Sequence, residues 1–109
     1  MRNNIYLVVL LSFSFVANAY NGNDLYQWGK VYQSNDTLNL HYGFYMGYVS
    51  ATAHTAGALG AFCAPEDTTD GQIFDIVYDY TRSNPAKRTD DASIMIVKSL
   101  QDAYPCIKH

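Results

Sequence analysis

The chain has 109 residues, of which 49% are hydrophobic, 16% are charged and 15% are aromatic, and its formal net charge is −3. This length accommodates one domain at most, which excludes a TIM barrel, a two-domain dinucleotide-binding enzyme and a long repeat array. Ten carboxylates outnumber seven basic side chains, without any basic run, so the composition argues against a nucleic-acid partner. The ten tyrosines are the one unusual count, and they indicate a packed domain rather than a disordered chain.

Residues 1–19 have the three parts of a secretory signal peptide. Arg2 supplies a basic start, segment 5–16 is mostly apolar, and Ala17-Asn18-Ala19 forms an A-x-A cleavage site. The alternative is a membrane anchor, but a helix of about 12 residues spans only about 18 Å of a hydrocarbon core of about 30 Å. We therefore predict cleavage after Ala19 and a single exported domain at 20–109. No later run is apolar enough to span a membrane, so we expect a soluble product without a membrane partner.

Cys63 and Cys106 are the only cysteines. In an oxidising compartment, one pair of cysteines predicts one disulfide. A metal site is disfavoured because the chain has no second cysteine pair and its three histidines are scattered. A catalytic cysteine is less favoured because each cysteine lies in or beside a proline-containing turn. The predicted bridge closes a loop of about 44 residues, which chain-entropy reasoning values at about 4 kcal/mol.

Hydrophobic spacing predicts a short helix and then a longer one after the signal peptide. The first has Asn23 or Asp24 as its N-cap and ends in the polar stretch 33–36. Its apolar positions are Leu25, Trp28, Val31 and Tyr32. The apolar positions of the second are Leu38, Tyr42, Tyr45, Met46, Val49, Ala53 and Ala56. The same helix carries small residues at spacing four, which predicts close packing within the domain or in a dimer: Gly43, Gly47 and Ala51.

Two further helices follow, and the third helix of the chain has the clearest start. Thr69-Asp70-Gly71-Gln72 matches a capping box, and Asn84-Pro85 ends the helix. It has two apolar faces. One contains Ile73, Ile76, Val77 and Tyr80, and the other contains Phe74, Tyr78 and Thr81. After a charged loop at 87–91, the fourth helix carries Ala92, Met95, Ile96, Ser99, Leu100 and Ala103 on one side. We predict a compact all-α domain with four main helices, additional short helices and one disulfide.

The sequence shows no recognisable catalytic, metal or cofactor site. His41, His54 and His109 have no metal-ligand spacing, so we expect structural or exposed roles for them. Asp75 and Asp79 stand one helical turn apart, an arrangement open to acid–base work or to a cation, but a solvated polar face is the favoured interpretation. We therefore predict that the chain has no catalytic residues, no metal site and no cofactor. The favoured interpretation is an exported binding protein that is not an enzyme.

Five short motifs occur in order between positions 45 and 106. They are Tyr45-Met46-Gly47-Tyr48-Val49, Phe62-Cys63-Ala64-Pro65, Thr69-Asp70-Gly71-Gln72, Asn84-Pro85 and Ala103-Tyr104-Pro105-Cys106. Together they resemble the Rap/Tai family of periplasmic immunity proteins, which protect bacteria from peptidoglycan amidases delivered by type VI secretion. The resemblance implies a helical homodimer that binds a secreted amidase effector and obstructs its catalytic cleft. It also implies that a second cysteine pair, common in the family, is replaced here by Gly29 and Tyr45.

Nearly all the matched residues have structural explanations, so the residues that recognise an effector are expected between the motifs. We predict an effector interface in two polar segments. Its acidic part contains Glu66, Asp67 and Asp70, and its other part contains Asn84, Lys87 and Arg88. Acidic side chains on this surface would pair with a basic rim on the effector. The alternative for each residue is an ordinary solvated loop.

Two other classes of protein remain open on the sequence alone. One is a periplasmic acid-stress chaperone of the HdeA type, or another small periplasmic binding protein, which shares the small size, helices, disulfide and export. The other is a small periplasmic enzyme whose groups meet only in the fold, such as His54 with a nearby carboxylate. The three histidines and ten carboxylates neither support nor exclude an acid trigger.

Overall fold

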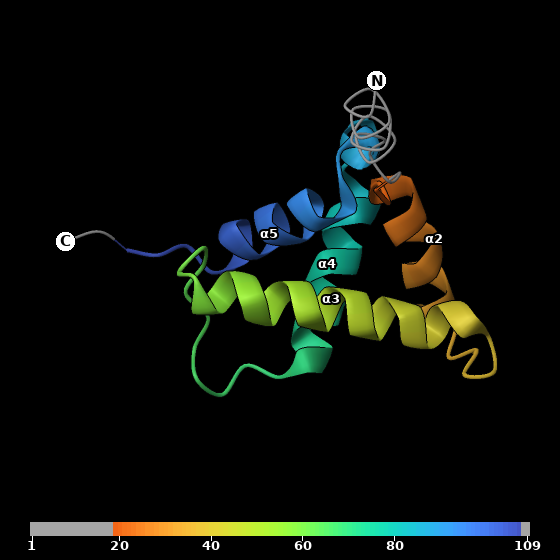
Figure 1. Ribbon diagram of the computed structural model, residues 1–109, viewed down its shortest axis with the longest axis horizontal. Coiled ribbons are helices and arrows are strands. Elements are labelled where there is room, and N and C mark those ends of the chain that lie inside the picture. Colours follow the sequence, from red (N-terminus) through yellow and green to blue (C-terminus); the bar gives the residue numbers. More distant parts are fainter. Residues whose placement is uncertain (1–18, 108–109) are drawn as a thin grey trace, which may run out of the picture.

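The computed structural model describes residues 19–107, and in this range it has four α-helices and one short 3₁₀-helix, without a β-strand (Figure 1). The elements are α2 (Gly22–Gln33), α3 (Leu40–Ala58), α4 (Asp70–Ser83), η1 (Pro85–Thr89) and α5 (Ala92–Ala103). The all-α prediction is confirmed. The predicted signal peptide, except Ala19, lies outside the described residues, as does His109. In the part of the chain that is described, each helix is too short or too polar to cross a membrane.

The long helix α3 organises the packing, because α2, α4 and α5 all contact it. Figure 1 shows α2 beside the first half of α3, α5 along its second half, and α4 crossing behind it. All four helices contribute to a single hydrophobic core. Its fully buried side chains include Leu25, Tyr45, Val49, Val77, Met95, Ile96 and Leu100. The inner side of α3 is therefore fixed by three neighbours, and its outer side is left exposed.

The first two helices begin at different residues from those predicted. Asn21, and neither Asn23 nor Asp24, is the N-cap of α2, because its side chain accepts hydrogen bonds from the backbone N–H groups of both. The Asp24 carboxylate in turn accepts from the N–H of Asn21 at 3.0 Å, which completes a capping box. Helix α3 begins at Leu40 after the N-cap Asn39. Leu38 was predicted on the apolar face, but it precedes the helix and is 98% exposed.

The start of α4 and the buried side of α5 largely follow the predictions. Thr69 accepts from the N–H of Gln72 at 3.2 Å, and the Gln72 side chain accepts from the N–H of Thr69 at 2.8 Å, so the predicted capping box is confirmed. The charged loop predicted after Pro85 instead begins as η1, since a proline at the first helical position favours a helical turn. Ala103 is exposed because α5 ends there and the chain turns toward Cys106.

Several tyrosines form an aromatic seam between α2, α3 and α4. Tyr45 is fully buried, and its hydroxyl donates to the carbonyl of Phe74 at 2.7 Å. Tyr32 stacks on the Tyr45 ring with centroids 5.4 Å apart. Burial raises the pKa of the Tyr45 phenol far above its ordinary value. The high tyrosine count is thus explained in part by packing between helices.

Candidate functional site

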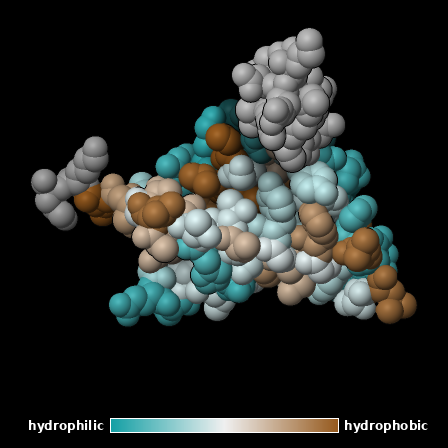
Figure 2. Space-filling view, in the orientation of Figure 1, coloured by the Kyte–Doolittle hydropathy of each residue, from teal (hydrophilic) through white to brown (hydrophobic). Residues whose placement is uncertain are grey.

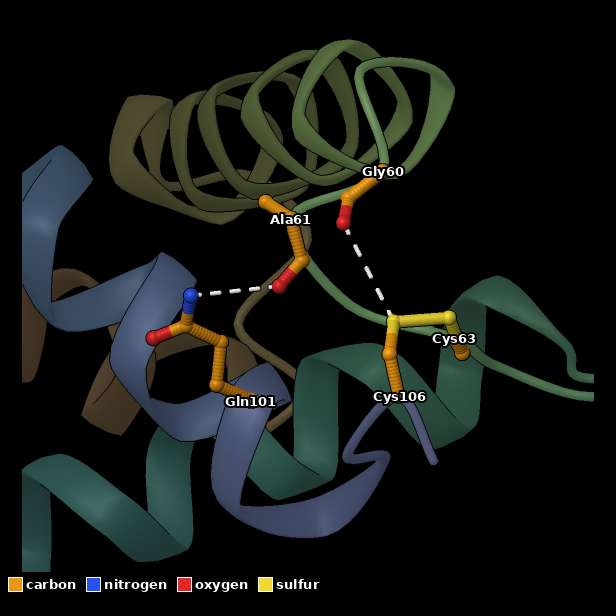
Figure 3. The surroundings of a disulfide bond; sticks show 5 residues. All are labelled: Gly60, Ala61, Cys63, Gln101 and Cys106. Atoms are coloured by element: carbon orange, nitrogen blue, oxygen red, sulfur yellow. Dashed lines mark hydrogen bonds between the residues drawn. A yellow bond between two sulfur atoms is a disulfide. The ribbon is translucent and has the colours of Figure 1, made fainter. Parts of the chain in front are cut away.

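The predicted disulfide between Cys63 and Cys106 is present (Figure 3). Their Cα atoms lie 4.9 Å apart, and the bridge joins the segment after α5 to the segment after α3. Hydrogen bonds support the same junction, since the N–H of Cys63 donates to the carbonyl of Tyr104 at 2.9 Å and the Gln101 amide donates to the carbonyl of Ala61 at 3.1 Å. The disulfide therefore fixes the loop that precedes α4.

The predicted acidic residues lie on this fixed loop and at the start of α4. Glu66, Asp67 and Asp70 are all exposed. The Asp70 carboxylate lies 3.1 Å from Nε2 of His54 and accepts a hydrogen bond from the Ser50 hydroxyl at 3.5 Å. Beside them is a concavity of about 300 Å³ with a largely apolar lining. Its lining residues are Ala53, His54, Gly57, Ala58, Phe62, Cys63, Ala64, Pro65, Thr68 and Ile73.

Arg88, from the second predicted segment, is held against the end of α4. Its Nε donates to the carbonyl of Thr81 at 2.7 Å, and its Nη2 donates to the carbonyl of Arg82 at 3.0 Å. Its guanidinium also lies 3.8 Å from the centroid of the Tyr26 ring. The last carbonyls of a helix have no partner within the helix, so Arg88 acts as a side-chain cap.

The other two residues of that segment also contact α4. The Asn84 amide donates to the carbonyl of Tyr80 at 2.9 Å, and the Lys87 ammonium donates to the Tyr80 hydroxyl at 3.4 Å. The acidic residues lie at the N-terminal end of this 14-residue helix, whose length is about 21 Å. The two halves of the predicted interface are therefore at opposite ends of α4 and do not form one continuous surface.

Within residues 19–107, the carboxylates and histidines considered for chemistry are exposed. Asp75 accepts a hydrogen bond from the Gln33 amide at 3.1 Å, and Asp79 pairs with Arg82 at 3.3 Å. His41 is exposed, and His54 pairs with Asp70. Among residues 19–107, His, Cys, Asp and Glu form no group of three that would hold a metal ion.

The outer face of α3 is exposed and uncharged. None of the 19 residues of this helix is Asp, Glu, Lys or Arg. A Cβ atom added at Gly43 or Gly47 would meet no neighbouring atom within 4 Å, so these glycines are not required for packing among the described residues. Figure 2 shows a mostly pale surface along α3, which is neither strongly polar nor strongly apolar. Of the two roles predicted for the small residues, close packing inside the domain is thereby wrong for Gly43 and Gly47.

A second concavity, of about 420 Å³, lies where α2 meets the start of α3. It is lined by Tyr20, Asp24, Gln27, Trp28, Leu40, His41 and Phe44, and we call it the aromatic groove. Leu40 and Phe44 are exposed apolar residues of its lining, and brown atoms mark this end of the molecule in Figure 2. Leu38 is 98% exposed and Leu40 is 81% exposed. The sequence gives no local signal for this groove, because its residues come from two segments that meet only when α2 packs on α3.

Comparison with known proteins gives one match. A family model described as Rap1a immunity proteins matches residues 21–106. This span contains all four helices and both disulfide cysteines. The chain belongs to the Rap1a immunity protein family. No match was found among curated proteins or solved structures.

Membership in the Rap1a family indicates an immunity protein that acts against a secreted effector, and immunity proteins are generally not enzymes. The motifs that carry the resemblance have structural roles in this member. Thr69 and Gln72 cap α4, Asn84 bonds to its last turn, and the two cysteines form the disulfide. A disulfide also fits an exported protein. These motifs therefore account for the fold, and the exposed side chains between them are the candidates for contact with an effector.

Proposed function

We propose that this chain is a periplasmic immunity protein that binds and blocks a peptidoglycan amidase delivered by type VI secretion. The family match over residues 21–106 carries this proposal. The predicted signal peptide at 1–19 and the disulfide support export. In this proposal the mature protein begins at Tyr20, and it acts by binding and not by catalysis.

We assign the effector contact to the acidic half of the predicted interface. Glu66, Asp67 and Asp70 are exposed on a loop that the disulfide holds in place, next to a concavity of about 300 Å³. Arg88 and Asn84, in contrast, already use their side chains to cap α4. A preformed acidic surface lowers the ordering cost of binding and accelerates association with a basic surface.

We also propose a homodimer in which the outer faces of two α3 helices meet. A two-fold interface brings the same surface of both copies together, so a face without charge avoids repulsion. In an antiparallel pair whose two-fold axis passes at the level of residue 49, Gly47 of one copy would lie against Ala51 of the other. The small residues at this crossing would permit close approach of the two backbones.

The decisive experiment uses the product of the reading frame next to this gene, which the proposal predicts to be a peptidoglycan amidase. Purified immunity protein is titrated into that amidase, and hydrolysis of peptidoglycan sacculi is followed by loss of turbidity. We expect inhibition to be complete near one immunity chain per amidase. An amidase that is neither bound nor inhibited would overturn the proposed function.

A charge reversal in the acidic segment tests the interface separately. Asp67→Lys is expected to slow association with the amidase by about tenfold at low salt, and much less at high salt. Asp102→Lys is the matched control, because it makes the same charge change at an exposed position on α5. Equal association rates for the two variants would reject the acidic surface while leaving the immunity function intact.

A further inference from the structure

The aromatic groove is built from rings that meet at steep angles. The centroids of Trp28 and Phe44 lie 4.5 Å apart with their planes at 68°, and those of Tyr20 and Trp28 lie 4.8 Å apart at 77°. The His41 ring is 6.2 Å from Trp28. These rings line a groove of about 420 Å³, in which Tyr20 is 45%, Phe44 36% and Trp28 5% exposed. Ring faces carry negative partial charge and attract cations.

One residue that lines this groove carries a full charge at neutral pH, and it is the acidic Asp24. Its Oδ2 accepts a hydrogen bond from the N–H of Asn21 at 3.0 Å, so the capping box of α2 holds the carboxylate in place. The remaining lining groups are the rings, the Gln27 amide and the Leu40 side chain. A fixed carboxylate beside aromatic rings is the usual composition of a site for an organic cation.

We propose that the aromatic groove binds a lysine or arginine side chain of a partner protein. The aliphatic stem of that side chain would pack on Phe44 and Leu40, and its cationic head would lie beside Asp24. Long basic side chains bury their methylene groups in this way while the charge stays near a polar partner. The net charge of −3 on this chain further favours a basic partner.

The rim of the groove indicates that the cation belongs to a protein. Leu38 is 98% exposed, although the turn that carries it is held by two backbone hydrogen bonds. The N–H of Thr37 donates to the carbonyl of Asn35 at 2.9 Å, and the N–H of Asn39 donates to the carbonyl of Asp36 at 3.0 Å. Leu40, two residues after Leu38, lines the groove and is 81% exposed. An ordered turn that leads an exposed leucine into the groove lining offers a macromolecule an apolar contact, which a free small cation would leave uncovered.

This inference deepens the proposed function, because identifying the partner as the secreted effector rests on that proposal. The chemistry of the groove is tested without any effector. The probes are Nα-acetyl-lysine methylamide, its norleucine counterpart without the ammonium group, and the peptide acetyl-Leu-Lys-Leu-amide. Each probe is titrated into the ¹⁵N-labelled protein with its disulfide intact, and the Trp28 indole N–H signal reports binding.

The lysine derivative is expected to bind about fivefold more tightly than the norleucine derivative, because only the former has a cation for Asp24 and the rings. Asp24→Gln should abolish this preference, since glutamine at this position keeps an acceptor for the capping box but lacks the charge. Asp102→Asn, an equal charge change on α5, should leave the preference unchanged. Circular dichroism and thermal melting confirm that each variant is folded. Equal affinity for the two probes, or an unchanged preference in Asp24→Gln, would overturn the proposal.

The rim is tested with the leucine-flanked peptide. It should bind about threefold more tightly than the lysine derivative, and Leu38→Ser should remove this gain without changing the affinity for the lysine derivative. A peptide that gains nothing from its leucines, or gains equally in Leu38→Ser, would reject a protein partner at this rim. Because both tests omit the amidase, their failure would not contradict the proposed immunity function. Failure of this protein to inhibit the amidase, in turn, would not contradict binding of a cation in the aromatic groove.

Discussion

Gly29 on α2 lies directly against the Tyr45 ring on α3, because a Cβ atom at position 29 would be 3.2 Å from Cε1 of Tyr45. The same Cβ would be 2.7 Å from Cδ1 of Tyr78 on α4. The resemblance to the Rap/Tai family places a second cysteine pair of relatives at the positions of Gly29 and Tyr45. In this chain the two positions are neighbours in space, and the Tyr45 ring covers the glycine.

Gly29→Ala should therefore destabilise the domain. The added methyl group meets two rings in a packed core, and overpacking of this kind costs about 1–3 kcal/mol. Urea unfolding followed by tyrosine and tryptophan fluorescence measures the free energy of unfolding. Gly43→Ala is the matched control, because a Cβ there meets no atom within 4 Å and alanine is the better helix former by about 1 kcal/mol. Equal effects of the two substitutions would contradict the close approach at Gly29.

Tyr45→Phe should lower stability and change its dependence on alkaline pH. The variant leaves the buried carbonyl of Phe74 without the hydroxyl donor at 2.7 Å, at a cost of about 1–2 kcal/mol. Burial raises the pKa of Tyr45 above its ordinary value of 10.0, so the unfolded state loses this proton at lower pH than the folded state. The stability that the folded state gains from keeping Tyr45 protonated is fully present below pH 10, and it is lost as the pH rises above 10.

Urea unfolding at several pH values between 8 and 11 tests the expected direction of this pH dependence. The wild type should lose stability above about pH 10, and Tyr45→Phe should lose less over the same interval. Burial also raises the pKa values of Tyr32, Tyr48 and Tyr78, so some alkaline sensitivity should persist in the variant. Identical slopes for both proteins would show that Tyr45 ionises equally easily in the two states.

Arg88→Ala should destabilise the domain much more than Lys87→Ala. Arg88 donates two hydrogen bonds to the last turn of α4 and lies over Tyr26, whereas Lys87 makes one long contact at an exposed position. Loss of charge-assisted hydrogen bonds to a helix end costs about 1.5–3 kcal/mol, and loss of an exposed lysine about 0–0.5 kcal/mol. Thermal melting of the two variants in parallel measures the difference. A similar small shift for both would mean that Arg88 is free to serve as a contact residue.

Local signals in the sequence predicted those parts of the fold that depend on neighbours along the chain. The Thr69–Gln72 capping box and the buried side of α5 involve residues within one or two helical turns. The disulfide was predicted by a different route, because two cysteines in an exported chain leave one possible pairing. These signals were sufficient for the all-α class.

Features that depend on the angles between helices could not be read in this way. The aromatic groove joins Tyr20 and Asp24 to Phe44, which are brought together only when α2 packs on α3. Arg88 reaches the end of α4 because η1 folds the chain back, and its sequence neighbours indicated only a charged loop. The separation of the two interface segments, in contrast, follows from the predicted helix between Thr69 and Asn84, which places them at its opposite ends.

The proposed dimer gives a prediction at Gly47. Gly47→Arg adds a long charged side chain to the outer face of α3, where nothing lies within 4 Å of the added Cβ, so the fold should be retained. In the proposed pair each arginine would lie against Ala51 of the other copy, with the two like charges near the two-fold axis, so close packing and charge would both oppose association. Sedimentation equilibrium should show a dimeric wild type and a Gly47→Arg variant whose dissociation constant is raised at least about 100-fold. Asp102→Arg, on the exposed side of α5, should leave the dimer intact. A wild type that sediments as a monomer at about 100 μM chains would reject the dimer and leave the α3 face free for the effector.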